Sequence, residues 1–113
     1  MKEIKAYIRT DALANTVNAL EAAGTPGITV VSVHPVGYGF DPNFFLPETK
    51  DPVKNYPAIT KLEVVCKDQD VDRFVEIISG NSYTGTKGDG MIFITSVDRA
   101  IKIRTGKQGE AAL

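Results

Sequence analysis

The sequence has 113 residues, with 13 lysines and arginines against 14 aspartates and glutamates, and a formal net charge of −1 at pH 7. This length fits one hydrophobic core, so we treat residues 1–113 as a single domain. The balanced charge argues against nucleic-acid binding, which normally needs a strong positive field.

The single cysteine and the single histidine offer little material for a metal centre or a nucleophilic enzyme. Cys66 follows the alternation of Leu62 and Val64, which predicts a buried thiol that packs as a small apolar side chain. His34 has no second histidine or cysteine at a ligand spacing, so we expect it to be structural. No Ser-His-Asp or Cys-His set is supported by spacing. We therefore predict no metal site, no catalytic residues and no enzyme.

The ends of the chain and its hydropathy bear on its location. The first residues, M-K-E-I-K, lack the apolar run of a signal peptide. No stretch approaches the roughly 18 apolar residues that a membrane span needs. We expect a cytoplasmic protein that does not insert into membranes, and the absence of paired cysteines agrees with a reducing compartment.

The first elements predicted along the chain are a strand and a helix. Residues 4–9 alternate apolar and more polar side chains, which predicts a strand. Residues 13–23 repeat apolar side chains at helical spacing, with Thr10 or Asp11 available to cap the start and Gly24 to end the helix.

Two further strands flank a long segment without periodicity. Residues 27–33 are rich in β-branched side chains and predict the second strand. From Pro35 to Ala58, prolines, glycines and turn formers replace any sustained period, which indicates a functional or mobile loop. Alternation resumes over residues 60–66, the third predicted strand.

A second helix and a fourth strand complete the pattern. Residues 71–78 carry an apolar stripe at helical spacing, with Asp68 or Asp70 as the expected cap and residues 80–81 as the expected end. Residues 91–94 form a short apolar run typical of a core strand.

This order of elements predicts an α+β, ferredoxin-like βαββαβ fold, in which an antiparallel sheet carries both helices on one face. The opposite face of the sheet would then be uncovered. We expect oligomerisation to cover it, because a large exposed apolar face promotes association. We find no internal repeat, linker or low-complexity tract.

Three glycine-bearing segments fall in predicted loops: residues 37–39, 84–90 and 104–109. The middle one, T-G-T-K-G-D-G, has glycines that would let backbone N–H groups approach an anion. It is not a Walker A motif, because its glycines lead directly into a strand, and on spacing alone an ordinary turn explains it better. Residues 37–39 lack the strand-turn-helix setting of a dinucleotide fingerprint and read as a loop hinge.

Two cations near the end of the chain form another candidate anion site. In an extended segment, Lys102 and Arg104 would lie on one side and Ile103 on the other. Such a pair suits a phosphate chain, although by itself it is more typical of a solvated surface. The residues alone therefore predict an α+β domain with candidate anion-binding loops.

Three stretches resemble a known family. Residues 84–93, T-G-T-K-G-D-G-M-I-F, resemble the B-loop signature of PII signalling proteins, T-G-x-x-G-D-G-K-I-F. Residues 101–113, I-K-I-R-T-G-K-Q-G-E-A-A-L, resemble the C-loop, I-R-I-R-T-G-E followed by an Ala-rich end. Residues 24–30 are similar to the family's G-x-x-G-M-T-V. The resemblance implies the same fold, assembled as a homotrimer whose sheets face inward.

The resemblance also implies a function and a site. ATP or ADP would bind between adjacent subunits, at the B-loop (84–90) of one chain, the C-loop (102–110) of the next and the base of a long T-loop (about 38–58). The T-loop would regulate a protein partner in nitrogen metabolism, a membrane transporter being the first expectation. The implied nucleotide-binding residues are Tyr7, Thr29, Gly37, Tyr38, Gly39, Glu63, Val65, Gly88, Asp89, Gly90, Met91, Lys102 and Arg104.

Several positions depart from the family pattern and mark the chain as a divergent member. Met91 replaces a phosphate-contacting lysine and Lys102 replaces an arginine, which predicts weaker phosphate binding or a preference for ADP or AMP. Asp41 replaces the glutamine that helps hold Mg-ATP and 2-oxoglutarate, and its charge would repel a dicarboxylate unless a metal such as Mg²⁺ intervened. These departures argue against binding of 2-oxoglutarate. Tyr56 lacks the context of the family's modifiable residue, so we expect it to pack.

Two other functions fit part of the pattern. One is a ferredoxin-like trimer that binds a metal or another small molecule without sensing nucleotides, its glycine loops being purely structural. The other is a slow nucleotide hydrolase in which Asp41 or Asp89 assists a metal. The first lacks metal ligands and the second lacks a general base placed by the sequence.

Overall fold

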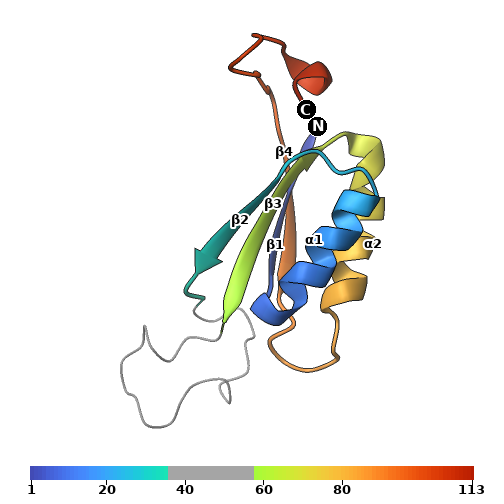
Figure 1. Cartoon of the computed structure of the whole chain (residues 1–113), viewed down its shortest axis with the longest axis vertical. Helices are drawn as coiled ribbons and strands as arrows, with labels where there is room; N and C mark the ends of the chain where they lie inside the picture. The colour runs from blue at the N-terminus through green and yellow to red at the C-terminus, as the bar shows by residue number, and fades with distance from the viewer. Residues whose placement is uncertain (36–57) are drawn as a thin grey trace.

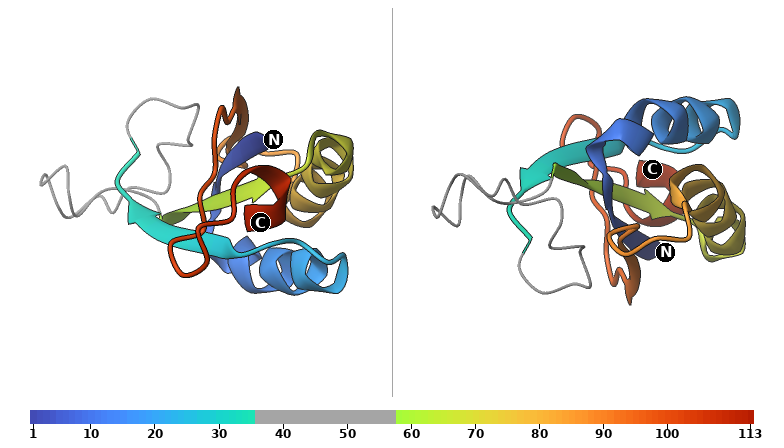
Figure 2. Two further views of the ribbon diagram at one scale, coloured as in Figure 1. Left: turned by 90° about the horizontal axis from the view of Figure 1, so that it is seen from above. Right: turned by 90° about the horizontal axis from the view of Figure 1, so that it is seen from below.

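The computed structural model describes residues 1–35 and 58–113. Their strands form one antiparallel sheet in the order β2-β3-β1-β4. Figures 1 and 2 show both helices on the same face of that sheet, which confirms the predicted ferredoxin-like α+β arrangement. The elements are β1 (Lys2–Arg9), α1 (Leu13–Ala22), β2 (Ile28–Val33), β3 (Ile59–Cys66), α2 (Val71–Ser82) and β4 (Met91–Ser96).

The core lies between the sheet and the two helices. Alternate residues of the central strands β1 and β3 are buried, and Leu20 of α1 with Phe74 and Ile78 of α2 packs against them. This is the two-residue period predicted for strands with one face toward the core. Cys66 is fully buried as predicted, and burial is the main cause that raises the pKa of its thiol.

The predicted cap of α1 is wrong. Thr10 and Asp11 lie in a short 3-10 helix, and Ala12 takes the N-cap position without a side-chain bond. Thr10 instead joins β1 to the start of β3: its Oγ1 is 2.8 Å from Oγ1 of Thr60, and its N–H donates to the carbonyl of Ala58 at 2.9 Å. A threonine hydroxyl can bond to any nearby donor or acceptor, and here it bonds to the neighbouring strand and not to the start of the helix.

The predicted cap of α2 is wrong for a similar reason. Asp68 and Asp70 belong to another short 3-10 helix. Asp70 does occupy the N-cap position, but its side chain makes no capping bond. Its carboxylate lies 3.2 Å from Nη2 of Arg73 in the first turn of the helix. The cation therefore takes the oxygen that would otherwise accept a backbone N–H.

The two helix ends differ in how well they match the sequence pattern. Gly24 has φ +80° and follows the C-cap of α1, so it ends that helix as predicted. The predicted end of α2 at residues 80–81 is too early, because the helix continues to Ser82. There the side chain of Asn81 donates to the carbonyl of Ile77 at 2.8 Å, a bond made within the helix.

The sheet face without helices carries charge as well as apolar surface. Nζ of Lys61 lies 2.9 Å from Oε1 of Glu63, and Nζ of Lys5 lies 3.4 Å from Oε1 of Glu3. Lys5 and Glu63 are direct partners in the register of β1 and β3, so the two pairs adjoin. The expectation of an apolar open face is therefore only partly right: charged pairs occupy its centre, and exposed apolar side chains lie on the edge strand β4.

Candidate functional site

The loop that joins α2 to β4, residues 83–90, is tied to the end of β1 by Arg9. Nη2 of Arg9 donates to Oγ1 of Thr86 at 3.0 Å and to the carbonyl of Lys87 at 2.7 Å. Nε of Arg9 lies 3.5 Å from Oδ1 of Asp89. One guanidinium thus contacts the loop at three residues and fixes it against the sheet.

The carboxylate of Asp89 is used inside this loop. Its Oδ2 accepts the N–H of Thr84 at 2.8 Å and the N–H of Gly85 at 2.9 Å, and its Oδ1 accepts the hydroxyl of Thr84. Desolvation by itself would raise the pKa of Asp89, but these hydrogen bonds and the Arg9 guanidinium together hold that pKa below its usual value. Asp89 therefore closes the loop as an ionised acceptor.

All three glycines of the predicted phosphate-binding stretch, residues 84–90, adopt backbone angles that side chains disfavour. Gly85 has φ +84°, Gly88 has φ +98° and Gly90 has φ +107°. A Cβ built on Gly90 would lie 1.7 Å from the carbonyl oxygen of Tyr7. Only glycine fits there, because the loop backbone is pressed directly onto β1.

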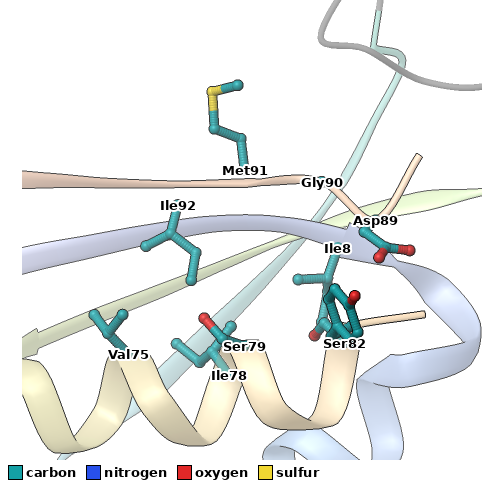
Figure 3. Close-up of a pocket in the computed structure, with 10 residues that line it drawn as sticks. Ile8, Val75, Ile78, Ser79, Ser82, Asp89, Gly90, Met91 and Ile92 are labelled. Atoms are coloured by element: carbon teal, nitrogen blue, oxygen red, sulfur yellow. The ribbon is translucent and has the colours of Figure 1, made fainter. Parts of the chain in front are cut away.

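The open face of the sheet beside this loop is lined by Tyr7, Met91 and Phe93. Tyr7 pairs with Met91 of β4 in the sheet register. The rings of Tyr7 and Phe93 meet edge to face, with centroids 6.0 Å apart and planes at 86°. Figure 3 shows that the Met91 side chain points away from α2, opposite to Ile92. The result is an apolar wall next to the glycine loop, a surface on which a flat ring can pack.

Thr29, Glu63 and Val65 meet elsewhere on the sheet. Thr29 of β2 pairs with Glu63 of β3, and all three residues line a cavity of about 300 Å³. The C-terminal segment forms part of the same cavity through Ala112 and Leu113. The hydrogen bond to Glu63 is the main cause that raises the pKa of Lys61, so that neighbouring cation stays charged.

Residues 101–108 form a hairpin, which we call the arm. The N–H of Lys102 donates to the carbonyl of Lys107 at 2.8 Å, and the N–H of Gly106 donates to the carbonyl of Lys102 at 2.7 Å. Gly106 has φ +71°, which lets the chain reverse. The prediction of an extended segment with Lys102 and Arg104 on one side is therefore wrong, because Arg104 lies in the turn of the arm.

The arm and the glycine loop lie at opposite ends of β4 (Figure 1). The loop precedes Met91 and the arm follows Ser96. Since a strand rises roughly 3.3 Å per residue, this six-residue strand separates them by about 20 Å. Within one chain, the cations of the arm do not meet the glycine loop.

The predicted site residues thus fall into separate groups. One group lies at the glycine loop: Tyr7, Gly88, Asp89, Gly90 and Met91. A second lies on β2 and β3: Thr29, Glu63 and Val65. Lys102 and Arg104 stand apart on the arm. Gly37, Tyr38, Gly39, Asp41 and Tyr56 lie outside the described residues.

Sequence reasoning missed two parts of this arrangement. Alternation places Arg9 only on the polar face of a strand, whereas its contact with the loop joins residues 77 positions apart, which no local pattern reveals. Ala112 and Leu113 match only a short Ala-rich end in the sequence, yet they line the same cavity as Thr29. Their only signal in the sequence is apolar character after a polar turn.

Other predictions concern metals and membranes. Among residues 1–35 and 58–113, no group of three or more His, Cys, Asp or Glu side chains is arranged to hold a metal ion. No helix in the same ranges is long and apolar enough to cross a membrane. His34 is exposed just after the end of β2.

Comparisons with known proteins point to one family. The family model of nitrogen regulatory protein P-II matches residues 1–107. Nitrogen regulatory protein P-II 2 of Methanothermobacter thermautotrophicus is 43% identical over 115 residues, covering 100% of this chain and 97% of that protein. Nitrogen regulatory protein P-II of Cereibacter sphaeroides is 40% identical, covering 100% of both chains. Nitrogen fixation nifHD1 region GlnB-like protein 2 of Methanosarcina barkeri is 35% identical, covering 100% of this chain and 99% of that protein. The chain belongs to the P-II family of nitrogen regulatory signal proteins.

Proposed function

We propose that this chain is a homotrimeric cytoplasmic sensor that binds ATP, ADP or AMP in clefts between its subunits. Bound nucleotide would change the T-loop and so regulate a protein partner, with a membrane transporter as the expected class. The observation that carries the proposal is the separation of the arm from the glycine loop along β4. A phosphate chain that needs both must take them from two different chains.

The chemistry of the two parts is complementary. The glycine loop offers backbone N–H groups where Gly88 and Gly90 leave no Cβ in the way of an anion. The arm carries Lys102 and Arg104, both exposed, and neither forms an ion pair with an acid among the described residues. Backbone donors from one subunit and cations from the next would then surround the phosphates.

The adenine base would use the open face of the sheet, where the apolar wall of Tyr7, Met91 and Phe93 supports stacking. Thr29 and Glu63 line a separate cavity, so their contact with the same base stays a prediction. Met91 brings no charge to the phosphates, and Lys102 is a point charge without the fork of an arginine. We therefore expect weaker phosphate binding or a preference for ADP or AMP.

A signalling role suits this site better than hydrolysis. The Asp89 carboxylate already accepts bonds from Thr84 and Gly85 and lies beside Arg9, so it is poorly placed to hold a catalytic metal. We propose that the chain is not an enzyme. ATP turnover that an Asp89→Asn variant loses, without losing nucleotide affinity, would contradict this assignment.

Isothermal titration with ATP, ADP and AMP tests the binding proposal. Each nucleotide is titrated with and without Mg²⁺ and 2-oxoglutarate. We expect micromolar binding that Arg104→Ala abolishes, with no requirement for 2-oxoglutarate. The control variant is Lys67→Ala, because Lys67 is an exposed cation between β3 and α2 that belongs to neither the arm nor the glycine loop. Absence of binding to all three nucleotides would overturn the proposal.

The switching step needs its own test. A ligand can shift a loop only if it binds one loop conformation better than another. We expect limited proteolysis of the full chain to cut within residues 38–58 at different rates with and without saturating nucleotide. Identical rates, together with measured nucleotide binding, would contradict regulation through the T-loop.

A further inference from the structure

A mostly apolar pocket of about 440 Å³ opens between the second half of α2 and the start of β4. Figure 3 shows its walls: Ile92 of β4 and Ile8 of β1 face Val75 and Ile78 of α2. Pockets that bind small molecules usually measure about 300 to 1,000 Å³ and are mainly apolar. The size and the lining of this pocket therefore suit a small organic molecule.

The pocket lies on the other side of the sheet from the apolar wall that we propose for the adenine base. Ile8 and Ile92 pack with the core on the helix side, and side chains alternate along a strand. The pocket meets the predicted nucleotide-binding residues only at Asp89, Gly90 and Met91, and the side chain of Met91 points away from α2. It is therefore a separate compartment that borders the glycine loop.

Ser82 gives this pocket a buried polar group without a partner. The residue lines the pocket at the end of α2 and is only 6% exposed. Its hydroxyl oxygen has no hydrogen-bond partner among the described residues. Buried hydroxyls are normally satisfied, and one that is not costs stability. An occupant with a single hydrogen-bonding group would satisfy it, since a hydroxyl can both donate and accept.

The charges at the pocket favour a neutral occupant. Among the described residues that line it, none is a lysine, arginine or histidine, so a carboxylate or phosphate would find no cation there. Asp89 is the one charged residue of this lining. Its carboxylate already accepts the N–H groups of Thr84 and Gly85 and lies beside Arg9, so its oxygens are engaged. Burying a charge without a partner is strongly unfavourable, which excludes an anion and disfavours a cation.

Tyr83 supplies an exposed aromatic ring at the rim. The residue lines the pocket and yet is 77% exposed. An apolar ring inside the pocket would cover part of this side chain, and contact between rings adds to the gain from burial. Since a cavity of about 150 Å³ can hold benzene, this pocket has room for one ring and its substituent.

We propose that the α2–β4 pocket is a second ligand site, which takes a neutral, mostly apolar small molecule whose one hydrogen-bonding group pairs with Ser82. The apolar part of the ligand would pack among Ile8, Ile78 and Ile92. This site goes beyond the proposed nucleotide site and does not depend on it, because none of its contacts uses a phosphate group or a cation.

Methyl NMR of the native assembled protein tests the site with benzyl alcohol, a probe that has one ring and one hydroxyl. We expect saturable shift changes at the methyl groups of Ile8, Ile78 and Ile92, with a dissociation constant of about 1 mM or lower. The internal control is Ile28 of β2, at the opposite edge of the sheet from β4. Shifts that do not saturate, or that are equal at Ile28, would overturn the proposal.

The expected neutrality of the ligand is tested with benzoate and benzylammonium, which keep the ring of the probe and add a charge of either sign. We expect each ion to bind at least about tenfold more weakly than benzyl alcohol, because the pocket offers neither ion a free partner. Equal affinity of either ion would overturn the assignment of a neutral occupant.

Ser82→Ala tests the hydrogen bond. We expect it to weaken binding of benzyl alcohol by about three- to tenfold. The thermal stability of the ligand-free protein should stay the same or rise, because the substitution removes an unsatisfied hydroxyl. The control is Ser32→Ala, which changes an exposed serine on β2 and should leave the affinity unchanged. Equal affinities of the two variants would refute the role of Ser82.

Two further variants locate the probe. Ser79 lines the pocket from the exposed surface of α2, so Ser79→Phe should fill the pocket and abolish saturable binding without disturbing the core. Arg104→Ala, which is expected to abolish nucleotide binding, should leave benzyl alcohol binding unchanged. Binding that persists in Ser79→Phe, or that is lost in Arg104→Ala, would place the probe elsewhere and overturn the proposal.

Discussion

The glycine loop and the arm are both proposed to bind phosphate, and both contain a glycine with positive φ, yet they are held very differently. The loop is fixed to the rest of the chain by Arg9, by the Asp89 carboxylate and by the contact of Gly90 with Tyr7. The arm is held by bonds within its own segment, such as that from the N–H of Lys102 to the carbonyl of Lys107. The loop is therefore preformed against the rest of its own chain, whereas the arm is shaped by bonds within its own segment.

The largest expected effect is at Gly90. A Cβ there would overlap the Tyr7 carbonyl and would also sit at φ +107°. We expect Gly90→Ala to lower the free energy of unfolding by about 3 kcal/mol or more, measured by urea denaturation. The matched control is Gly80→Ala in α2, where a Cβ meets nothing within 4 Å. It should stabilise the protein by up to about 1 kcal/mol. Equal effects of the two substitutions would mean that the loop is not pressed onto β1.

Arg9→Ala should have the next largest effect. It removes two hydrogen bonds and an ion pair from a guanidinium whose side chain is 11% exposed. We expect a loss of about 2 kcal/mol in the free energy of unfolding and faster hydrogen exchange in residues 84–89. Arg9→Lys should recover only part of this unfolding free energy, because an ammonium group lacks the several N–H donors by which the guanidinium contacts the loop. Unchanged exchange in this segment would refute the anchoring role of Arg9.

Asp89 makes the anchoring dependent on pH. Its pKa in the folded chain is below the unfolded value of about 3.9. Its stabilising contribution is therefore fully present above about pH 4 to 5 and is lost as the pH falls through the lower, folded-state pKa. We expect the difference in unfolding free energy between the native protein and Asp89→Asn to shrink as the pH is lowered from 6 to 3. A constant difference across this range would contradict the depressed pKa.

Gly106→Ala tests the arm as Gly90→Ala tests the glycine loop, since each adds a Cβ at a glycine with positive φ. Gly106 has φ +71°, but a Cβ there meets nothing within 4 Å. We expect a cost of about 1 kcal/mol from the backbone angle alone. Calorimetry of the variant would give this figure, and a cost as large as that of Gly90→Ala would show that the arm is packed in a way the single chain does not reveal.

The smallest expected effect on folding is that of Arg104→Ala. Arg104 is exposed, and exposed side chains away from special features change the free energy of unfolding by no more than about 0.5 kcal/mol. Denaturation of the nucleotide-free protein measures this value. A small effect on folding, together with the expected loss of nucleotide binding, would show that the arm, unlike the glycine loop, contributes to binding and not to stability.

The fold could be predicted from the sequence because the patterns that determine its strands and helices are local. Alternation in β1 and β3 and the apolar stripe of α2 follow from periods of two and 3.6 residues that a short window contains. The helix caps could not be predicted from the sequence, because Thr10 bonds to Thr60, 50 positions away, and Asp70 pairs with Arg73 and not with the backbone. The residue type shows that a side chain can cap a helix, but the fold determines which partner lies within reach.

The part of the candidate site that could be predicted from the sequence is the part marked by glycines. The pattern of residues 84–90 matched a known loop, and its positive φ angles are what glycine permits. The hairpin of the arm was missed because I-K-I-R alternates as a strand does, while the bond that closes the turn through Gly106 is a feature of the backbone. Arg9 was missed because its contacts join segments that are distant in the sequence.

The charged pairs on the open face have a consequence for the newly made chain. Because Lys61, Glu63, Lys5 and Glu3 occupy the middle of that face, a single folded subunit presents a hydrated surface to its surroundings. Such a surface resists association with unrelated proteins. In the proposed trimer, a neighbour that covers this face would have to supply opposite charges or polar groups to the same pairs. The charges would therefore limit aggregation of the single subunit and would also select the identity and alignment of its neighbour.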